Sequence, residues 1–275
     1  MHTLIDTRIR ASWRPAIRPH DRNCITRAAH DKFLNLNHHG GNLVDKTLKS
    51  VEQAVAPVFD GATILLGGFG DPGLPGQLLE ALRRQGAKNL TVVHNGSGGG
   101  VHSLGGLIHD GKVKKLIASF PSNPGNQSFQ EKYLKGEVEL ELVPQGTLAE
   151  RIRAAGAGLG GFFTPTGAGT DLAAGKEARV INGRDMIFEK ALHADFAFVR
   201  AYRGDRFGNL NYRMAMRNFN VPMCTAAKHT VAEIDELVPV GSIDPEDVHT
   251  PGIFVDHVVE IVRIPEYLVI TTEGR

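Results

Sequence analysis

One stretch, D-G-A-T-I-L-L-G-G-F-G-D-P-G-L-P at residues 60–75, constrains the fold of this chain more than any other. A turn at Asp60-Gly61 precedes an apolar run typical of a buried strand, and a glycine-rich elbow then leads into a helix. Because glycine has no Cβ, a ligand or a second chain can approach the backbone of the elbow closely. A helix that begins directly after it offers unpaired N–H groups to an anion. The stretch therefore predicts a strand, an elbow and a helix with a ligand site at the turn.

The remainder of the chain alternates strand and helix patterns. Strands are expected at residues 62–66, 90–93, 113–119, 138–142, 195–201, 210–214 and 230–238, with a hairpin over 179–188 that turns on Asn182-Gly183. Helices are expected from an Asp45 N-cap to a stop near Pro57, from Leu74 to a stop at Gly86, at 103–109, around Phe129 and Tyr133, and at 147–155. This alternation predicts an α/β fold, with an open, mainly parallel sheet flanked by helices in a single domain.

Composition excludes several classes of function. The chain has 275 residues, 41% of them hydrophobic, and can bury a large core. Its 31 basic and 30 acidic residues nearly cancel, so neither nucleic acid nor a membrane is expected as a partner. No apolar run approaches the ~20 residues of a membrane span. Two cysteines fit a reducing compartment, and no cluster has metal-ligand spacing. We expect a cytoplasmic protein without a metal.

Residues 1–43 differ from the rest of the chain. Seven basic residues stand against three aspartates, and no apolar period is sustained. The segment is interpreted as a disordered extension or a start placed too early, as an Arg-rich transit peptide, or as a functional arm. The first interpretation is favoured, because basic unpatterned tails are usually solvated. The predicted organisation is a basic extension over 1–43 and one domain over 44–275.

The elbow also matches a dinucleotide-binding motif. G-F-G-D-P-G at 68–73 fits G-x-G-x-x-G between a strand and a helix. Such a site needs an acidic residue about 20 positions later, at the end of the second strand, to hold the ribose. That strand ends in His94-Asn95-Gly96, without a carboxylate, and Asp71 inside the loop would repel a pyrophosphate. A nicotinamide-dependent oxidoreductase is therefore kept only as an alternative.

Five blocks together resemble a known family. They are residues 60–75, V-P-Q-G-T-L-A-E-R-I-R at 143–153, G-F-F-T-P-T-G at 161–167, A-M-R-N-F-N at 215–220 and H-T-P-G-I at 249–253. Their order and sequence are similar to those of the alpha subunit of family I coenzyme A-transferases, which include 3-oxoacid and 3-oxoadipate CoA-transferases. The resemblance covers about residues 45–261.

The resemblance implies an enzyme with half of its active site. The family's nucleophile is a glutamate of the beta subunit in a Ser-Glu-Asn-Gly type sequence, and this chain lacks that sequence. The implied reaction moves CoA from succinyl-CoA to a 3-oxoacid by ping-pong exchange, through a glutamyl-CoA thioester on the beta subunit. Activity is expected only in a heterodimer or heterotetramer with that subunit. Coenzyme A is the implied co-substrate, and no permanently bound cofactor is expected.

Two polar residues are predicted to act in catalysis. Gln145 lies between a strand and a helix and matches the family position assigned to oxyanion stabilisation; the alternative is that it caps the helix. Asn95 follows the second strand and matches a residue that orients the reacting carboxyl groups, or else is a turn residue. His94 beside it is interpreted as structural.

Three further points concern ligands. Gly67, Gly68, Phe69 and Gly70 are predicted to receive the pantetheine arm of CoA or the partner's glutamate loop, unless the elbow is only a tight turn. Arg217 either binds a carboxylate acceptor or caps a strand. S-F-P-S-N at 119–123 is closer to the 3-oxoadipate than to the acetoacetate enzymes, so 3-oxoadipate is the favoured acceptor. A non-catalytic acyl-CoA-binding module with the same fold is the other alternative.

Overall fold

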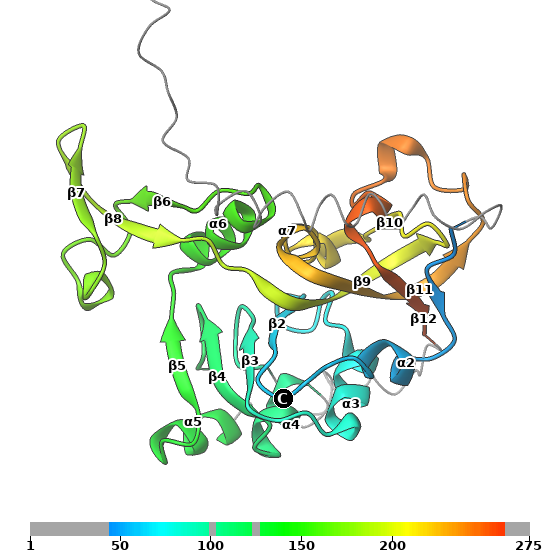
Figure 1. Cartoon of the computed structure of the whole chain (residues 1–275), viewed down its shortest axis with the longest axis horizontal. Coiled ribbons are helices and arrows are strands. Elements are labelled where there is room, and N and C mark those ends of the chain that lie inside the picture. Colours follow the sequence, from blue (N-terminus) through cyan, green and yellow to red (C-terminus); the bar gives the residue numbers. More distant parts are fainter. Residues whose placement is uncertain (1–43, 99–102, 123–126, 262–275) are drawn as a thin grey trace, which may run out of the picture. The chain divides into compact units, whose positions relative to one another are not determined.

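The computed structural model describes residues 44–98, 103–122 and 127–261 (Figure 1). The helices are α2 (Val51–Val55), α3 (Gly76–Gln85), α4 (Leu104–His109), α5 (Gln127–Leu134), α6 (Gln145–Gly156) and α7 (Asn220–Ala226). The strands are β1 (Thr47–Leu48), β2 (Thr63–Leu66), β3 (Leu90–Val93), β4 (Val113–Ala118), β5 (Glu139–Leu142), β6 (Gly161–Thr164), β7 (Ala178–Ile181), β8 (Arg184–Lys190), β9 (Ala194–Asp205), β10 (Leu210–Asn211), β11 (Ala227–Val238) and β12 (His257–Glu260). The expectations for residues 1–43 lie outside the described residues.

A mainly parallel sheet dominates the described part of the chain. Nine of its strands form one sheet in the order β1-β12-β11-β9-β2-β3-β4-β5, with β10 paired to β9. Only the β9–β10 pair is antiparallel. The predicted open, mainly parallel sheet flanked by helices is confirmed. The chain winds outward from β2 to β5 and then continues on the other side with β9, so the strand order reverses between β2 and β9. In α/β sheets, ligands bind at the carboxyl ends of the strands at such a reversal.

Both faces of the sheet are covered by helices (Figure 1). In the central strand β2, Ile64 and Leu66 pack with α2, α3, α4 and α5 on one face, and Leu65 packs with α6 and α7 on the other. The neighbouring strand β9 repeats this alternation, with Phe198 on the first face and Val199 on the second. Burial of each such side chain contributes about 1.5–3 kcal/mol, which is why a strand covered on both faces has a fully apolar sequence.

A second, smaller sheet is antiparallel and has the order β6-β8-β7. The predicted hairpin forms β7 and β8, and Asn182 and Gly183 at its tip have φ angles of 51° and 72°. Positive φ at both central residues defines the type I′ turn, which Asn-Gly favours. The sequence predicts this hairpin but not its pairing with β6, because the partner strand lies on the far side of a glycine-rich loop.

Several predicted boundaries differ from the structure, and two of them have a clear local cause. Asp45 does not cap a helix, because its carboxylate accepts the N–H of Thr47 (3.0 Å) and β1 follows; Ser50 caps α2 instead. The strand expected over 210–214 ends at Asn211, because the next backbone N–H, of Tyr212, donates to Nδ1 of His249 at 3.0 Å rather than to a strand. The chain then turns at Met214, whose φ is 52°.

The described residues contain no helix that is long and apolar enough to cross a membrane. They also contain no group of three or more His, Cys, Asp or Glu side chains arranged to hold a metal ion.

Candidate active site

The two predicted catalytic side chains touch each other. Asn95 follows β3, Gln145 is the first residue of α6 after β5, and Nε2 of Gln145 donates to Oδ1 of Asn95 at 2.7 Å. The carboxyl ends of parallel strands share one edge of the sheet, which is how residues from β3 and β5 meet across β4. The structure therefore brings these two amides into one polar site.

Asn95 is held firmly in this position. The residue is 7% exposed, and its carbonyl oxygen accepts the N–H groups of Ser119 (3.1 Å) and Phe120 (2.9 Å). The hydroxyl of Ser119 lies 3.3 Å from Oδ1 of Asn95, as a second donor beside Gln145. With these contacts from the end of β4, the Asn95 amide is a fixed acceptor that orients the amide of Gln145.

Gln145 does not cap the helix it begins. The N–H of Leu148 donates to the carbonyl of Pro144 at 2.8 Å, so α6 begins two residues earlier than predicted and Gln145 lies in its first turn. Its side chain makes no capping bond and is exposed. Within the described residues, one N–H of the amide donates to Asn95 and the other donates to no protein atom. That second N–H is a donor available to an oxyanion.

His94 has a structural contact, in agreement with its interpretation. The ring is 1% exposed, and its Nδ1 lies 2.9 Å from the carbonyl oxygen of Leu66 at the end of β2. Because a carbonyl only accepts, Nδ1 carries the proton. Burial lowers the pKa of His94, so the ring is neutral and joins the ends of β2 and β3.

Gly67 and Gly73 of the elbow pack around Asn220, a residue with no role predicted from the sequence. The N–H of Gly67 donates to the carbonyl of Phe198 on β9 at 2.8 Å, and a Cβ on Gly67 would overlap Oδ1 of Asn220. At Gly73, with a φ of 76°, a Cβ would lie 2.5 Å from Nδ2 of Asn220. Both glycines therefore have a packing reason inside the chain. The fully buried Asn220 fills the space where the strand order reverses.

The middle of the elbow, residues 69–72, faces solvent. Phe69 is 48% exposed, Gly70 has a φ of 65°, and a Cβ on Gly70 would meet no atom within 4 Å. Of the four elbow residues predicted to bind a ligand, Gly67 and Gly68 are buried and Phe69 and Gly70 are exposed. Contact with a large ligand is therefore open to the exposed pair.

The N-terminus of α3 is not free for an anion, which corrects the expectation from the sequence. Oε2 of Glu233 on β11 accepts the N–H groups of Gln77 and Leu78, each at 2.9 Å. Glu233 is fully buried, and Nη1 of Arg200 lies 3.7 Å from its Oε1. Burial raises the pKa of Glu233 from an ordinary 4.5 to about 7, partly offset by Arg200 and the two N–H groups. A side chain of the chain itself therefore occupies the position at the N-terminus of α3 where a pyrophosphate would bind.

Comparison with known proteins identifies the family. The sequence profile described as Coenzyme A transferase matches residues 48–261, which is most of the chain. The chain belongs to the coenzyme A transferase family. This assignment confirms the resemblance found in the sequence and removes the nicotinamide-dependent alternative.

Relatives and solved structures agree with the family. The alpha (A) subunit of the 3-oxoadipate CoA-transferase of Pseudomonas putida is 49% identical over 219 residues, which are 80% of this chain and 95% of that protein. The alpha (A) subunit of a probable succinyl-CoA:3-ketoacid coenzyme A transferase of Bacillus subtilis is 48% identical over 214 residues, 78% of this chain and 89% of that protein. The crystal structure of glutaconate coenzyme A-transferase from Acidaminococcus fermentans superimposes with a TM-score of 0.69 at 22% identity, over 78% of this chain and 75% of that one. That superposition supports the fold.

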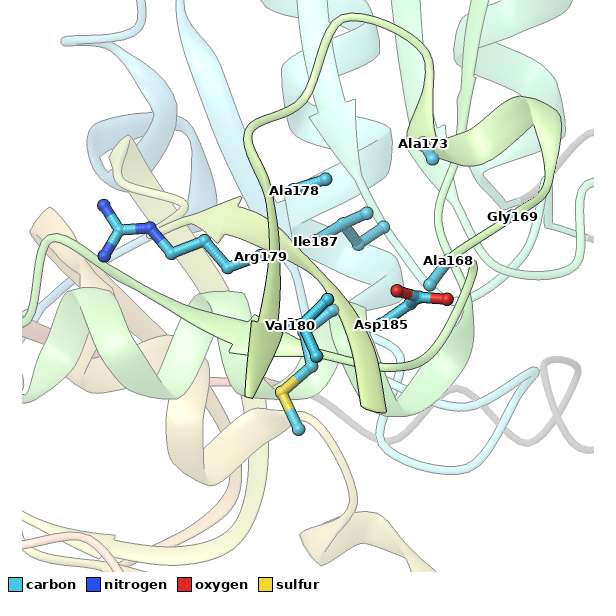
Figure 2. Close-up of a pocket in the computed structure, with 9 residues that line it drawn as sticks. Ala168, Gly169, Ala173, Ala178, Arg179, Val180, Asp185 and Ile187 are labelled. Carbon is cyan, nitrogen blue, oxygen red and sulfur yellow. The ribbon is translucent and has the colours of Figure 1, made fainter. Parts of the chain in front are cut away.

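This CoA-transferase chain also has a cavity of about 320 Å³ beside the small sheet (Figure 2). Its lining is Ala168, Gly169, Ala173, Ala178, Arg179, Val180, Asp185, Met186 and Ile187, and includes none of the predicted site residues. The Arg179 side chain extends away from Ala168 and Asp185 in Figure 2; its Nε donates to Glu177 at 2.6 Å and its guanidinium stacks on Phe163. The cavity is therefore not part of the candidate active site.

Sequence reasoning misses Asn220 and Glu233 in this CoA-transferase chain. Asn220 lies in the block R-N-F-N, which suggests no function by itself, and Glu233 lies on a strand that also carries Asp235 and Glu236. Because acidic residues recur along this strand, its sequence does not indicate that Glu233 is the fully buried one. Arg217 is exposed at the end of the 3-10 turn Met214–Arg217.

Proposed function

We propose that this chain is the alpha subunit of a CoA-transferase that moves CoA from succinyl-CoA to a 3-oxoacid, with 3-oxoadipate favoured over acetoacetate. The observation that carries the proposal is the Gln145–Asn95 amide pair at the carboxyl edge of the sheet, in a chain of the coenzyme A transferase family. The pair offers a fixed donor and no nucleophile, which is what one half of such a site requires.

The reaction needs a carboxylate nucleophile, and the beta subunit supplies it in this proposal. The carboxylate oxygen attacks the thioester carbon of succinyl-CoA, the C–S bond breaks, and CoA leaves as the thiolate. The thiolate then attacks the glutamyl carbon of the mixed anhydride, which releases succinate and leaves a glutamyl-CoA thioester. The acceptor acid reverses the two steps. Nothing is oxidised or reduced, so coenzyme A is required only as a co-substrate.

Each step passes through a tetrahedral oxyanion, and Gln145 stabilises it. One N–H of its amide donates to Asn95. Because the amide group is planar, this bond also fixes the direction of the second N–H. A preorganised donor of this kind stabilises charge that develops in the transition state, because it needs no reorganisation during the reaction. Asn95 acts by holding this donor and by orienting the reacting carboxyl groups.

The glutamates of the chain support a nucleophile on the partner. Among the described residues, Glu189 is buried against Lys176 at 2.6 Å, Glu141 pairs with Lys115 and Arg151, and Glu233 caps α3. These carboxylates already have structural partners. Both bacterial relatives are named as A subunits, a name that implies a second, different subunit. We expect a heterodimer or heterotetramer.

The exposed middle of the elbow, residues 69–72, receives the pantetheine arm of CoA in this proposal. Phe69 supplies apolar surface to that arm, and Gly70 lets it approach the backbone. The preference for 3-oxoadipate rests on the motif that begins S-F-P-S. Its Ser119 donates to Asn95, and its Phe120 is 64% exposed at the end of β4, next to the amide pair. Asn123 of that motif lies outside the described residues.

Consumption of succinyl-CoA by the purified chain tests the proposal. The assay is run with and without the beta subunit, and with 3-oxoadipate or acetoacetate as the acceptor. Activity only with the beta subunit, and a higher kcat/KM for 3-oxoadipate, is the expected result. Activity of the chain alone would contradict the placement of the nucleophile. Saturable acyl-CoA binding without turnover in any combination would favour the non-catalytic binding module.

A further inference from the structure

Two fully buried polar side chains hold the elbow (residues 67–75) and the first turn of the helix that follows it. Asn220 and Glu233 are both 0% exposed, and they reach the elbow from α7 and from β11. We infer that Asn220 and Glu233 are positioning residues, which fix the elbow in the geometry that binds acyl-CoA. This inference rests on the proposed role of the elbow, and it adds two residues that act on the substrate through it.

Asn220 holds the start and the end of the elbow with one amide. Its Nδ2 donates to the carbonyl oxygens of Gly73 (3.1 Å) and Met216 (2.7 Å), and its Oδ1 accepts the N–H of Arg200 at 3.1 Å. The same Oδ1 lies against Gly67, where no Cβ would fit. Apart from a long contact with Oδ1 of Asn218 (3.5 Å), the partners of the amide are backbone groups, so it acts as a template for the path of the backbone.

Glu233 fixes the helix into which the elbow runs. Its Oε2 accepts the N–H groups of Gln77 and Leu78, in the first turn of α3 and two residues after the elbow ends. Its Oε1 makes no hydrogen bond within the described residues. A fully buried carboxylate with one unbonded oxygen is costly, and an apolar residue of similar size would pack there at lower cost. The carboxylate therefore points to a role beyond packing, and the contact with α3 supplies one.

Arg200 connects the two side chains. Its backbone N–H donates to Asn220, and its guanidinium lies 3.7 Å from Glu233 and 2.8 Å from Asp235. The charged groups that act on Glu233 are thus Arg200 from β9 and Asp235 from β11 itself, while α3 presents backbone N–H groups to it. Arg200 lies closer to Asp235 than to Glu233, so the hydrogen bonds of Glu233 are those with the first turn of α3.

Between Gly67 and Gly73, which both contact Asn220, the elbow is exposed from Phe69 to Pro72. Nδ2 of Asn218 donates to the carbonyl of Pro72 at 2.9 Å, from the same loop that leads to Asn220. The exposed segment is thus placed by groups at its ends and not by a packed layer above it. A small displacement of either end is transmitted to the surface that meets the substrate.

Two isosteric variants test the inference in the assembled enzyme with the beta subunit. Asn220→Asp replaces the donor that faces Gly73 and Met216 with an acceptor, and Glu233→Gln removes the charge beside α3. Glu236→Gln on the same strand, where Glu236 pairs with Arg203 at the surface, is the matched control. Backbone hydrogen exchange of residues 67–78 reports on the elbow, and the KM for succinyl-CoA and kcat report on its function.

Faster exchange at residues 67–78 and a KM for succinyl-CoA raised about tenfold, with kcat changed less than about twofold, are expected for Asn220→Asp. In the wild type, the KM should rise as the pH falls through about 7, because protonation removes the charge of Glu233. In Glu233→Gln that limb of the pH profile should be absent, a result that a merely structural role would not give. The control should behave as the wild type.

The outcomes separate this inference from the proposed function. Unchanged exchange in both variants would overturn the role of the two anchors and leave the proposed function intact. Faster exchange with an unchanged KM would overturn the link to acyl-CoA, and with it the elbow's place in the proposed function. If Asn220→Asp does not assemble with the beta subunit, the pH profile of Glu233→Gln decides the question by itself.

Discussion

Oδ1 of Asn220 occupies the position that a Cβ of Gly67 would take, although the two residues lie on different elements and are far apart in the sequence. Because of this contact, the side chain of Asn220 leaves room only for glycine at position 67. The contact also separates two glycines of the elbow that look alike in the sequence, because Gly70 has open space around it.

Gly67→Ala should therefore destabilise the protein more than Gly70→Ala. A methyl group at Gly67 forces Asn220 out of its bonds, and overpacking of this kind typically costs about 1–3 kcal/mol before the lost hydrogen bonds are counted. At Gly70 only the positive φ opposes alanine, at about 1–2 kcal/mol. Urea unfolding of both variants measures the difference. Equal losses of unfolding free energy would show that Asn220 moves aside without cost.

Gln145→Ala should lower the turnover number of the assembled enzyme about 10²-fold, as the loss of an oxyanion donor does elsewhere. Asn95→Ala should also lower it, because Asn95 aims the same donor. The double variant should be little worse than Gln145→Ala alone, since the two side chains act as one unit. Glu150→Gln, on the exposed surface of the same helix, is the control. A turnover number that Gln145→Ala leaves unchanged would remove the oxyanion assignment.

The stability of the chain should depend on pH through Glu233. Its pKa is raised in the folded state to about 7, so its contribution to stability is fully present below the ordinary value of 4.5 and is lost as the pH rises through about 7. The free energy of unfolding of the wild type should fall by an amount on the order of 3 kcal/mol over this range relative to Glu233→Gln. Denaturant titrations at several pH values measure it. Parallel pH dependences of the two proteins would contradict the burial effect.

Arg217 offers a test of the preferred acceptor. Its side chain is exposed beside Asn218, which holds the elbow, and no carboxylate among the described residues pairs with it. 3-Oxoadipate has a second carboxylate that acetoacetate lacks. Arg217→Ala should therefore raise the KM for 3-oxoadipate about tenfold, the scale of one charge-assisted hydrogen bond, and leave the KM for acetoacetate unchanged. An equal effect on both acids would show that Arg217 does not read the second carboxylate.

Local elements of the fold could be predicted from the sequence, and contacts between distant elements could not. The apolar run at 90–93 matches β3, and Gly86, with a φ of 101°, ends α3 as expected. Asp45 and Ser50 are both able to cap a helix. The choice between them depends on β1, which pairs with β12 near the other end of the chain. No local pattern contains that information.

The candidate site shows the same division. Gln145 and Asn95 could be singled out because each follows a recognisable strand and matches a family position, and parallel strands bring such residues to one edge. The contacts of Asn220 with Gly73 and of Glu233 with Leu78 span 147 and 155 residues. Their residue types fit many roles, so only the folded chain reveals that they act on the elbow.

The capped helix α3 has a consequence for how this protein handles its ligand. In a nucleotide-binding turn, the bound phosphate completes the hydrogen bonding of the helix, and the empty protein is left with unmet donors. Here the side chain of Glu233 accepts those N–H groups in place of a phosphate. The turn is complete before any substrate arrives and after every product leaves. A transferase that exchanges one acyl group for another in each cycle can thus release its ligand repeatedly, while the elbow and the start of α3 keep their hydrogen bonds.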